Sequence, residues 1–157
     1  MIKKIIIAIA VLIAFAVAAF IAAGIYAVNN VPEGIVLNWD YPDAVVVGDE
    51  FDVTITVINE LDERRQLGDL SFYSPLLDGA SIVSFDPAPA QDQGALPFID
   101  HSVSYNRSIK AEDEFVIVVT MIAEEAGVFS GDVEVTIDGM LSMHTTTQTL
   151  VIEESDD

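Results

Sequence analysis

The residues that could carry out chemistry are few in this sequence, and none of them is a cysteine. Without cysteine there can be no disulfide framework, thiolate zinc site, iron–sulfur cluster or cysteine nucleophile. The segment Asp100-His101-Ser102 contains the three residue types of a hydrolase triad. Neighbouring side chains on a strand point to opposite faces, however, so these three would not relay a proton. The segment from Gly79 to Val83 lacks the second glycine of a nucleophile elbow, and we expect no catalytic residues and no enzymatic activity.

Metal ligands are equally sparse. His101 and His144 are the only two histidines, and a copper site of the cupredoxin kind would also need a thiolate. The carboxylates gather in short clusters, which are Asp49/Glu50/Asp52, Asp62/Glu63, Glu112/Asp113/Glu114 and Glu124/Glu125. Calcium requires roughly six to eight converging oxygen atoms, and no cluster matches an EF-hand loop. We predict no bound metal and no cofactor, and we keep an exported metal- or ligand-binding protein as an alternative function.

The charge of the chain is strongly one-sided. There are 26 acidic residues against 6 Lys and Arg, the formal net charge is −20 at pH 7, and every acidic residue follows Val28. A surface of this kind repels the phosphates of nucleic acids, so we predict no nucleic-acid partner. Three explanations for the acidity stay open: adaptation of the surface to high salt, loose binding of divalent cations, or a basic partner.

Lys3 and Lys4 precede an apolar run from Ile5 to Val28 that contains no charged residue and no proline. A helix rises about 1.5 Å per residue and the hydrocarbon core of a bilayer is roughly 30 Å thick, so the run predicts a transmembrane helix. The positive-inside rule then places the N-terminus in the cytoplasm and the rest of the chain outside it. The run is longer than the roughly 7–15 apolar residues of a signal peptide, so we expect it to remain attached. The predicted location is the cell membrane, as a single-pass protein in contact with the lipid bilayer.

Four alanines, Ala10, Ala14, Ala18 and Ala22, recur at a regular interval within this run. Residues four positions apart share one face of a helix, so these alanines form a stripe of small side chains. In a bilayer such a stripe lets two helix backbones approach closely. We predict a helix-packing face for a membrane-protein partner or for self-association, although an alanine-rich helix also shows this spacing by chance.

After the run, the sequence has the pattern of strands and turns. From Phe51 to Ile58 apolar residues alternate with Asp and Thr, which indicates a strand with one buried face. The segment from Glu114 to Ala123 is apolar on both faces, which is typical of a central strand. Asp138-Gly139 is a hairpin signal between two further strands, whereas Asp86 to Pro97 is expected to be the longest irregular connection. The pattern predicts an all-β, antiparallel sandwich of about seven to nine strands.

The domain boundaries follow from the same pattern. We assign residues 1–28 to a cytoplasmic stub and the transmembrane helix, 29–34 to a short linker, 35–152 to the sandwich and 153–157 to an acidic tail. Within the sandwich, Asn106-Arg107-Ser108 is a glycosylation sequon. Asn106 is therefore a candidate site for glycosylation of an exported domain.

The stretch from Val47 to Asn59, with the sequence VGDEFDVTITVIN, resembles the opening of immunoglobulin-like modules on prokaryotic cell surfaces. In that group a Gly-acid pair precedes a strongly alternating strand that ends in Asn. The strand from Phe115 to Ala123 and the following segment from Gly127 to Gly131 are similar to the second half of such a module. The resemblance implies an immunoglobulin-like sandwich used for adhesion, spacing or assembly, and it implies no chemistry.

These observations predict a non-catalytic, membrane-anchored extracytoplasmic interaction domain. We expect it to be an accessory or assembly subunit of a membrane or cell-surface complex. A pilin-like subunit of a surface filament is a further alternative, because such subunits also combine an N-terminal apolar helix with a β-rich head. Against it, Ile5 stands after Lys4 where pilins have a small residue, and no acidic residue occurs before Glu33.

Overall fold

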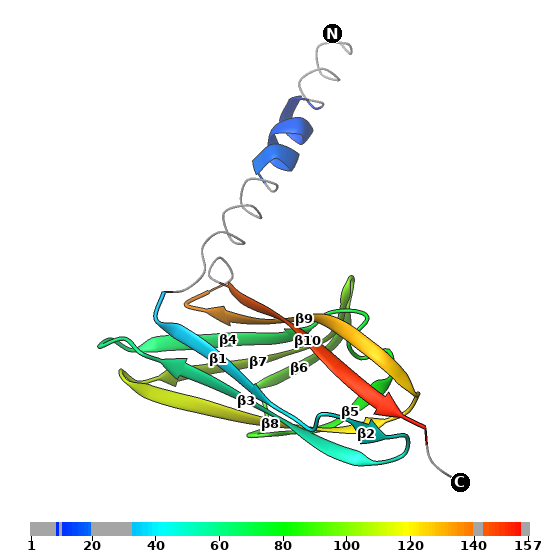
Figure 1. Ribbon diagram of the computed structural model, residues 1–157. Helices are drawn as coiled ribbons and strands as arrows, with labels where there is room; N and C mark the ends of the chain where they lie inside the picture. The colour runs from blue at the N-terminus through cyan, green and yellow to red at the C-terminus, as the bar shows by residue number, and fades with distance from the viewer. Residues whose placement is uncertain (1–8, 10, 20–32, 140–142, 155–157) are drawn as a thin grey trace.

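The computed structural model describes residues 9, 11–19, 33–139 and 143–154. Its β-strands form a two-layer sandwich of a four-stranded sheet, in the order β1-β3-β8-β5, and a six-stranded sheet, in the order β2-β10-β9-β4-β7-β6 (Figure 1). The strands are β1 Ile35–Asp40, β2 Val45–Val46, β3 Glu50–Asn59, β4 Arg65–Phe72, β5 Ala80–Asp86, β6 Gln91–Leu96, β7 Ile99–Ile109, β8 Asp113–Ala123, β9 Gly127–Ile137 and β10 Met143–Glu153. Neighbouring strands are antiparallel, except that β2 is parallel to β10. The predicted β-sandwich is confirmed.

The core lies between the two sheets and follows from the two-residue period of the strands. In β3, Phe51, Val53, Ile55 and Val57 are all buried, as their alternation with polar residues predicts. β8 lies between β3 and β5, which agrees with its prediction as a central strand. The six-stranded sheet contributes the opposite wall of the core, mainly from β4, β7 and β9.

The described part of the chain has ten strands, more than the expected seven to nine. The additional strand is β6, which lies within the segment that we expected to be the longest irregular connection. None of its residues is buried, and its pairing with β7 shifts register twice. A strand of this kind has no apolar alternation to reveal it, because it pairs at an edge without covering the core.

The described helix covers residues 11–19. No helix among the described residues is both long and apolar enough to cross a membrane. This finding contradicts the predicted location. The prediction of a single-pass cell-membrane protein, with a cytoplasmic N-terminus and an extracytoplasmic domain, is therefore wrong.

The predicted helix-packing face lies only partly within the described residues. Ala14 and Ala18 belong to the helix and are exposed. Ala10 and Ala22 lie outside the described residues, as does most of the linker assigned to 29–34.

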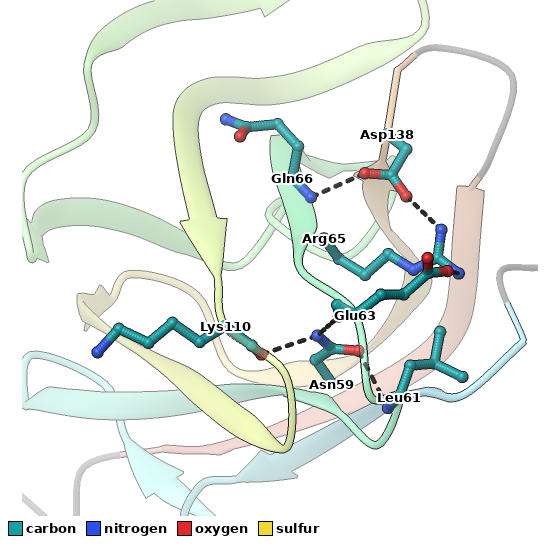
Figure 2. A network of polar contacts seen from close by, with 7 residues as sticks. All are labelled: Asn59, Leu61, Glu63, Arg65, Gln66, Lys110 and Asp138. Atoms are coloured by element: carbon teal, nitrogen blue, oxygen red, sulfur yellow. Dashed lines mark hydrogen bonds and ion pairs between the residues drawn. The ribbon is translucent and has the colours of Figure 1, made fainter.

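A buried amide holds one end of the sandwich together. Asn59, at the end of β3, is completely buried. Its Nδ2 donates hydrogen bonds of 2.8 Å to the carbonyl oxygens of both Glu63 and Lys110, and its Oδ1 accepts one of 3.2 Å from the Leu61 N–H (Figure 2). Glu63 lies in the connection from β3 to β4, and Lys110 in the connection from β7 to β8. One side chain therefore joins two connections that cross between the sheets.

A second polar contact next to Asn59 anchors the turn after β9. Asp138 has a φ of 54° and is followed by Gly139 at 109°, so both residues adopt the left-handed conformation that the Asp-Gly signal predicts. Asp138 Oδ1 accepts a hydrogen bond of 2.8 Å from the Gln66 N–H. Its Oδ2 accepts one of 2.9 Å from Arg65, which also pairs with Glu63 (Figure 2).

We expect Asn59→Ala to lower the free energy of unfolding by roughly 2–4 kcal/mol, because it leaves two carbonyl groups and one N–H without their partner. The control is Asn38→Ala on β1, since Asn38 is exposed and the chemical change is the same. This control should cost no more than about 0.5 kcal/mol. Urea unfolding followed by circular dichroism measures both values, and an equal loss in the two variants would contradict the role of Asn59.

Candidate functional site

β7 separates the triad-type residues, as strand geometry predicts. The ring of His101 packs 5.7 Å from that of Phe85, and its Nε2 lies 3.1 Å from Asp92 Oδ1. Ser102 is buried on the other face of the sheet, where its hydroxyl shares a hydrogen bond of 2.9 Å with that of Ser71. The side chains of this segment therefore do not form a relay.

The structure also keeps the candidate metal ligands apart. His101 on β7 and His144 on β10 are separated within one sheet by β4 and β9. At about 4.8 Å per strand spacing this separation is roughly 14 Å. Burial lowers the pKa of His144. Within the described residues, no group of three or more His, Cys, Asp or Glu side chains could hold a metal ion.

The carboxylate clusters meet in pairs at the two ends of the four-stranded sheet. Near the start of β3, the Ala123 N–H donates to the carbonyl of Asp49 at 3.0 Å, which places the cluster after β8 beside the cluster before β3. At the far end, the Glu112 N–H donates to the carbonyl of Leu61 at 3.0 Å. The clusters are therefore divided between opposite ends of the sandwich.

The predicted glycosylation residue, Asn106, is exposed on β7. It has a φ of 51°, and β7 shifts its register against β4 at this point. Such a shift marks a β-bulge, which turns the extra residue out of the ladder. The sequon is therefore accessible at the surface.

The outer face of the six-stranded sheet carries a polar network that the sequence analysis did not identify. The Tyr73 hydroxyl donates to Glu134 at 3.3 Å, and the Ser104 hydroxyl accepts from Gln93 at 2.6 Å and donates to Asp69. Burial raises the pKa of Glu134, the Tyr73 hydrogen bond partly opposes this shift, and the Asp69 carboxylate adds to it. Burial, with the Glu134 carboxylate next to it, also raises the pKa of Tyr73 to about 12. The acid–Val–acid alternation of β9 was the available signal for this face.

β10 is the longest strand at a sheet edge. On one side it pairs with β9 from Met143 to Ile152 without a register shift, but on the other side β2 covers only Ile152 and Glu153 (Figure 1). Backbone groups of successive residues in such a ladder point alternately to the two sides. The Glu153 carbonyl accepts from the Val47 N–H at 2.9 Å, and the Thr149 carbonyl accepts from the Tyr41 hydroxyl at 3.0 Å. The odd-numbered residues therefore direct their backbone groups away from β9.

By this alternation Thr145 and Thr147 also direct their N–H and C=O groups outward, and no strand in the described part of the chain pairs with them. The side chains of Thr145, Thr147 and Thr149 lie exposed on the outer face of the sheet. Thr146 and Gln148 point toward the inside and are half-buried. We call the outward backbone groups of Thr145 and Thr147 the β10 edge.

A pocket of about 30 Å³ opens beside this edge, between the two sheets. Its lining residues are mostly aromatic and aliphatic: Trp39, Tyr41, Val53, Phe72, Leu76, Leu77, Met121, Gln148, Thr149 and Leu150. The buried indole Nε1 of Trp39 has no hydrogen-bond acceptor among the described residues. A buried indole N–H usually has such an acceptor. We call the pocket that Trp39 lines the Trp39 pocket.

The strands around the edge and the pocket carry only negative charge. The charged residues of β1, β2, β9 and β10 are Asp40, Asp132, Glu134 and Glu153. Asp132 accepts a hydrogen bond of 2.6 Å from the Thr147 hydroxyl, and Glu134 lies opposite Thr145. Two carboxylates therefore stand on the strand next to the β10 edge, and neither strand contains Lys or Arg.

No family model and no curated protein matches this sequence. Among solved structures, the chain is similar to Escherichia coli α2-macroglobulin activated by porcine elastase, with 15% identity and a TM-score of 0.51 over 77% of this chain and 9% of that one. The trypsin-activated form of the Escherichia coli protein gives 15% identity and a TM-score of 0.50 over 76% of this chain and 7% of that one. The cupredoxin domain of amoB from Nitrosocaldus yellowstonii gives 10% identity and a TM-score of 0.49 over 79% and 90% of the two chains.

This chain therefore spans less than a tenth of the macroglobulin chains that it matches. The likeness shows the fold alone, which is an all-β, immunoglobulin-like sandwich. The resemblance seen in the sequence is confirmed to that extent.

We expect Glu134→Gln to stabilise the protein at neutral pH. The folded state raises the pKa of Glu134, so it favours the protonated form, and stability is lost as the pH rises and this carboxyl ionises. Glutamine removes that loss and can still accept the Tyr73 hydrogen bond. The gain in Tm should therefore be present at pH 7 and should disappear below about pH 4, near the ordinary pKa of Glu.

The control for this measurement is Glu114→Gln, because Glu114 is exposed and the substitution removes the same charge. Thermal unfolding of the three proteins from pH 3 to pH 8 makes the comparison. A gain that is equal for both variants at pH 7 would contradict an effect of burial at Glu134.

Proposed function

We propose that this protein is a non-catalytic interaction domain, an accessory or assembly subunit that binds an extended segment of a partner protein along β10. The observation that carries the proposal is the β10 edge, with the Trp39 pocket beside it. An extended peptide can add a strand to an open sheet edge, where main-chain hydrogen bonds supply affinity and pockets for alternate side chains supply specificity. The edge offers these hydrogen bonds at Thr145 and Thr147, and the pocket lies on the inward side of the same strand.

The other sheet edges in the described residues are less suited to strand addition. β1 and β2 have six and two residues, against eleven in β10. β5 and β6 are interrupted by register shifts at Val83 and around Gln93. Interrupted and short edge strands are common protections against pairing with another chain.

The sequence of β10 lacks the residues that usually protect an edge strand. From Met143 to Ile152 it contains no Asp, Glu, Lys, Arg, Pro or Gly. Its threonines favour extended structure, and its ladder with β9 is regular. In a chain with 26 acidic residues, such an uncharged stretch at an open edge supports a binding role.

The test uses photocrosslinking in the cells from which the protein comes. A photoreactive amino acid at Thr145, which is exposed beside the edge, should give an adduct with a discrete partner protein. The same amino acid at Val83, an exposed residue on β5, should not give that adduct. Gel mobility and mass spectrometry identify the products.

Thr147→Pro provides the decisive variant. Proline removes the outward N–H of Thr147 but leaves the inward ladder with β9 in place, so the Thr145 adduct should be lost. Thr147→Val keeps the backbone N–H and removes only the hydroxyl, and it should retain the adduct. No adduct from Thr145, or one that Thr147→Pro leaves unchanged, would contradict binding along β10.

A further inference from the structure

We infer that the partner segment is a basic strand, in which Lys or Arg side chains alternate with small aliphatic ones. This inference rests on the proposed function and specifies the chemistry of the partner. Three features of the β10 edge lead to it: its two-residue period, the size of the Trp39 pocket and the charges on β9.

The period of β10 assigns each side chain of an added strand to a face. Residues that lie opposite one another in a ladder project their side chains to the same side of the sheet. Partner residues opposite Thr145 and Thr147 therefore project to the outer face. Partner residues opposite Thr146 and Gln148 project inward, toward the space between β1 and β10.

The inward face selects small aliphatic side chains. Gln148 itself lines the Trp39 pocket, so a partner residue opposite it points toward the pocket mouth. A pocket of about 30 Å³ is small, so it favours a short aliphatic side chain such as valine or alanine over a larger one.

The outer face selects positive charge. Asp132 and Glu134 lie on β9, two strand spacings or about 10 Å from an added strand. Long Lys and Arg side chains can lie across β10 toward these carboxylates, which no Lys or Arg of β9 or β10 neutralises. A second copy of this chain would instead bring a net charge of −20 against another −20, which disfavours pairing of two β10 strands.

The probe is a synthetic nine-residue peptide of alternating Lys and Val, added to the full-length protein. Trp39 is the only tryptophan, so its fluorescence reports occupation of the pocket directly. We expect a saturable change in Trp39 emission, together with NMR shifts of the Thr145 and Thr147 amides. A peptide of the same composition with all Lys before all Val should bind at least tenfold more weakly, and a Glu–Val alternating peptide should not bind.

The variants separate strand addition from general attraction to an acidic protein. Thr147→Pro should abolish the binding of the alternating Lys–Val peptide, while Thr147→Val should retain it. The double variant Asp132→Asn, Glu134→Gln should weaken it about tenfold and reduce its salt dependence, because two carboxylates facing the peptide are gone. Asp49→Asn with Glu50→Gln, which removes two charges at the start of β3, is the matched control and should change the affinity less than twofold.

Equal binding of the Glu–Val peptide, equal binding to Thr147→Pro, or dimerisation of the chain through β10 would each overturn the inference. If the Thr145 adduct forms in cells and depends on Thr147, but the Lys–Val peptide does not bind, then the proposed function holds and this partner chemistry is wrong. If neither the adduct nor peptide binding is observed, both fail.

Discussion

The buried amide of Asn59 is the contact on which the arrangement of the two sheets depends. The chain crosses between the sheets after β3 and again after β7, and the Asn59 side chain bonds to the backbone of both connections. A buried amide tolerates few alternative geometries. Each donor or acceptor that loses its partner there destabilises the fold, because no water molecule replaces the lost hydrogen bond. The hydrophobic core supplies most of the stabilisation, whereas this amide specifies how the two layers join at one end.

The order of the strands within the two sheets determines which strands become edges. β1 ends the four-stranded sheet, and in the six-stranded sheet β10 is followed only by the two-residue β2. β2 covers only the last part of β10, so most of that strand keeps its outward hydrogen-bonding groups. The Trp39 pocket forms at the same place because β1 and β10 leave the space between the sheets open there.

Part of the acidity of the chain is located next to the β10 edge. In the sequence it has three open explanations, and the structure places two of the carboxylates, Asp132 and Glu134, directly beside an uncharged strand. Carboxylates next to an open edge repel another acidic chain and attract a basic one. A salt-adapted surface alone would not require the combination of an uncharged edge with acidic neighbours.

Much of the fold could be predicted from the sequence. Whether a given strand or helix was predicted correctly depended on whether a local pattern of residues encodes it. The alternation from Phe51 to Ile58 predicted β3 and its buried face, because the period of a strand is a local property. β6 could not be predicted, since its pairing with β7 leaves no apolar pattern. The apolar run from Ile5 to Val28 predicted a membrane-spanning helix from hydropathy, whereas no helix among the described residues is long and apolar enough to cross a membrane.

The sequence by itself determined the β-sandwich, the central position of β8 and the absence of thiol chemistry, since these depend on composition and on periods of a few residues. It also placed Asn59 at the end of the most regular strand. It did not indicate which groups the Asn59 amide binds. The tertiary structure alone decided that β10 is an open edge and that Trp39, Gln148 and Leu150 meet in one pocket. The order of strands in a sheet arises from packing between segments that are distant in the chain, and no local pattern encodes it.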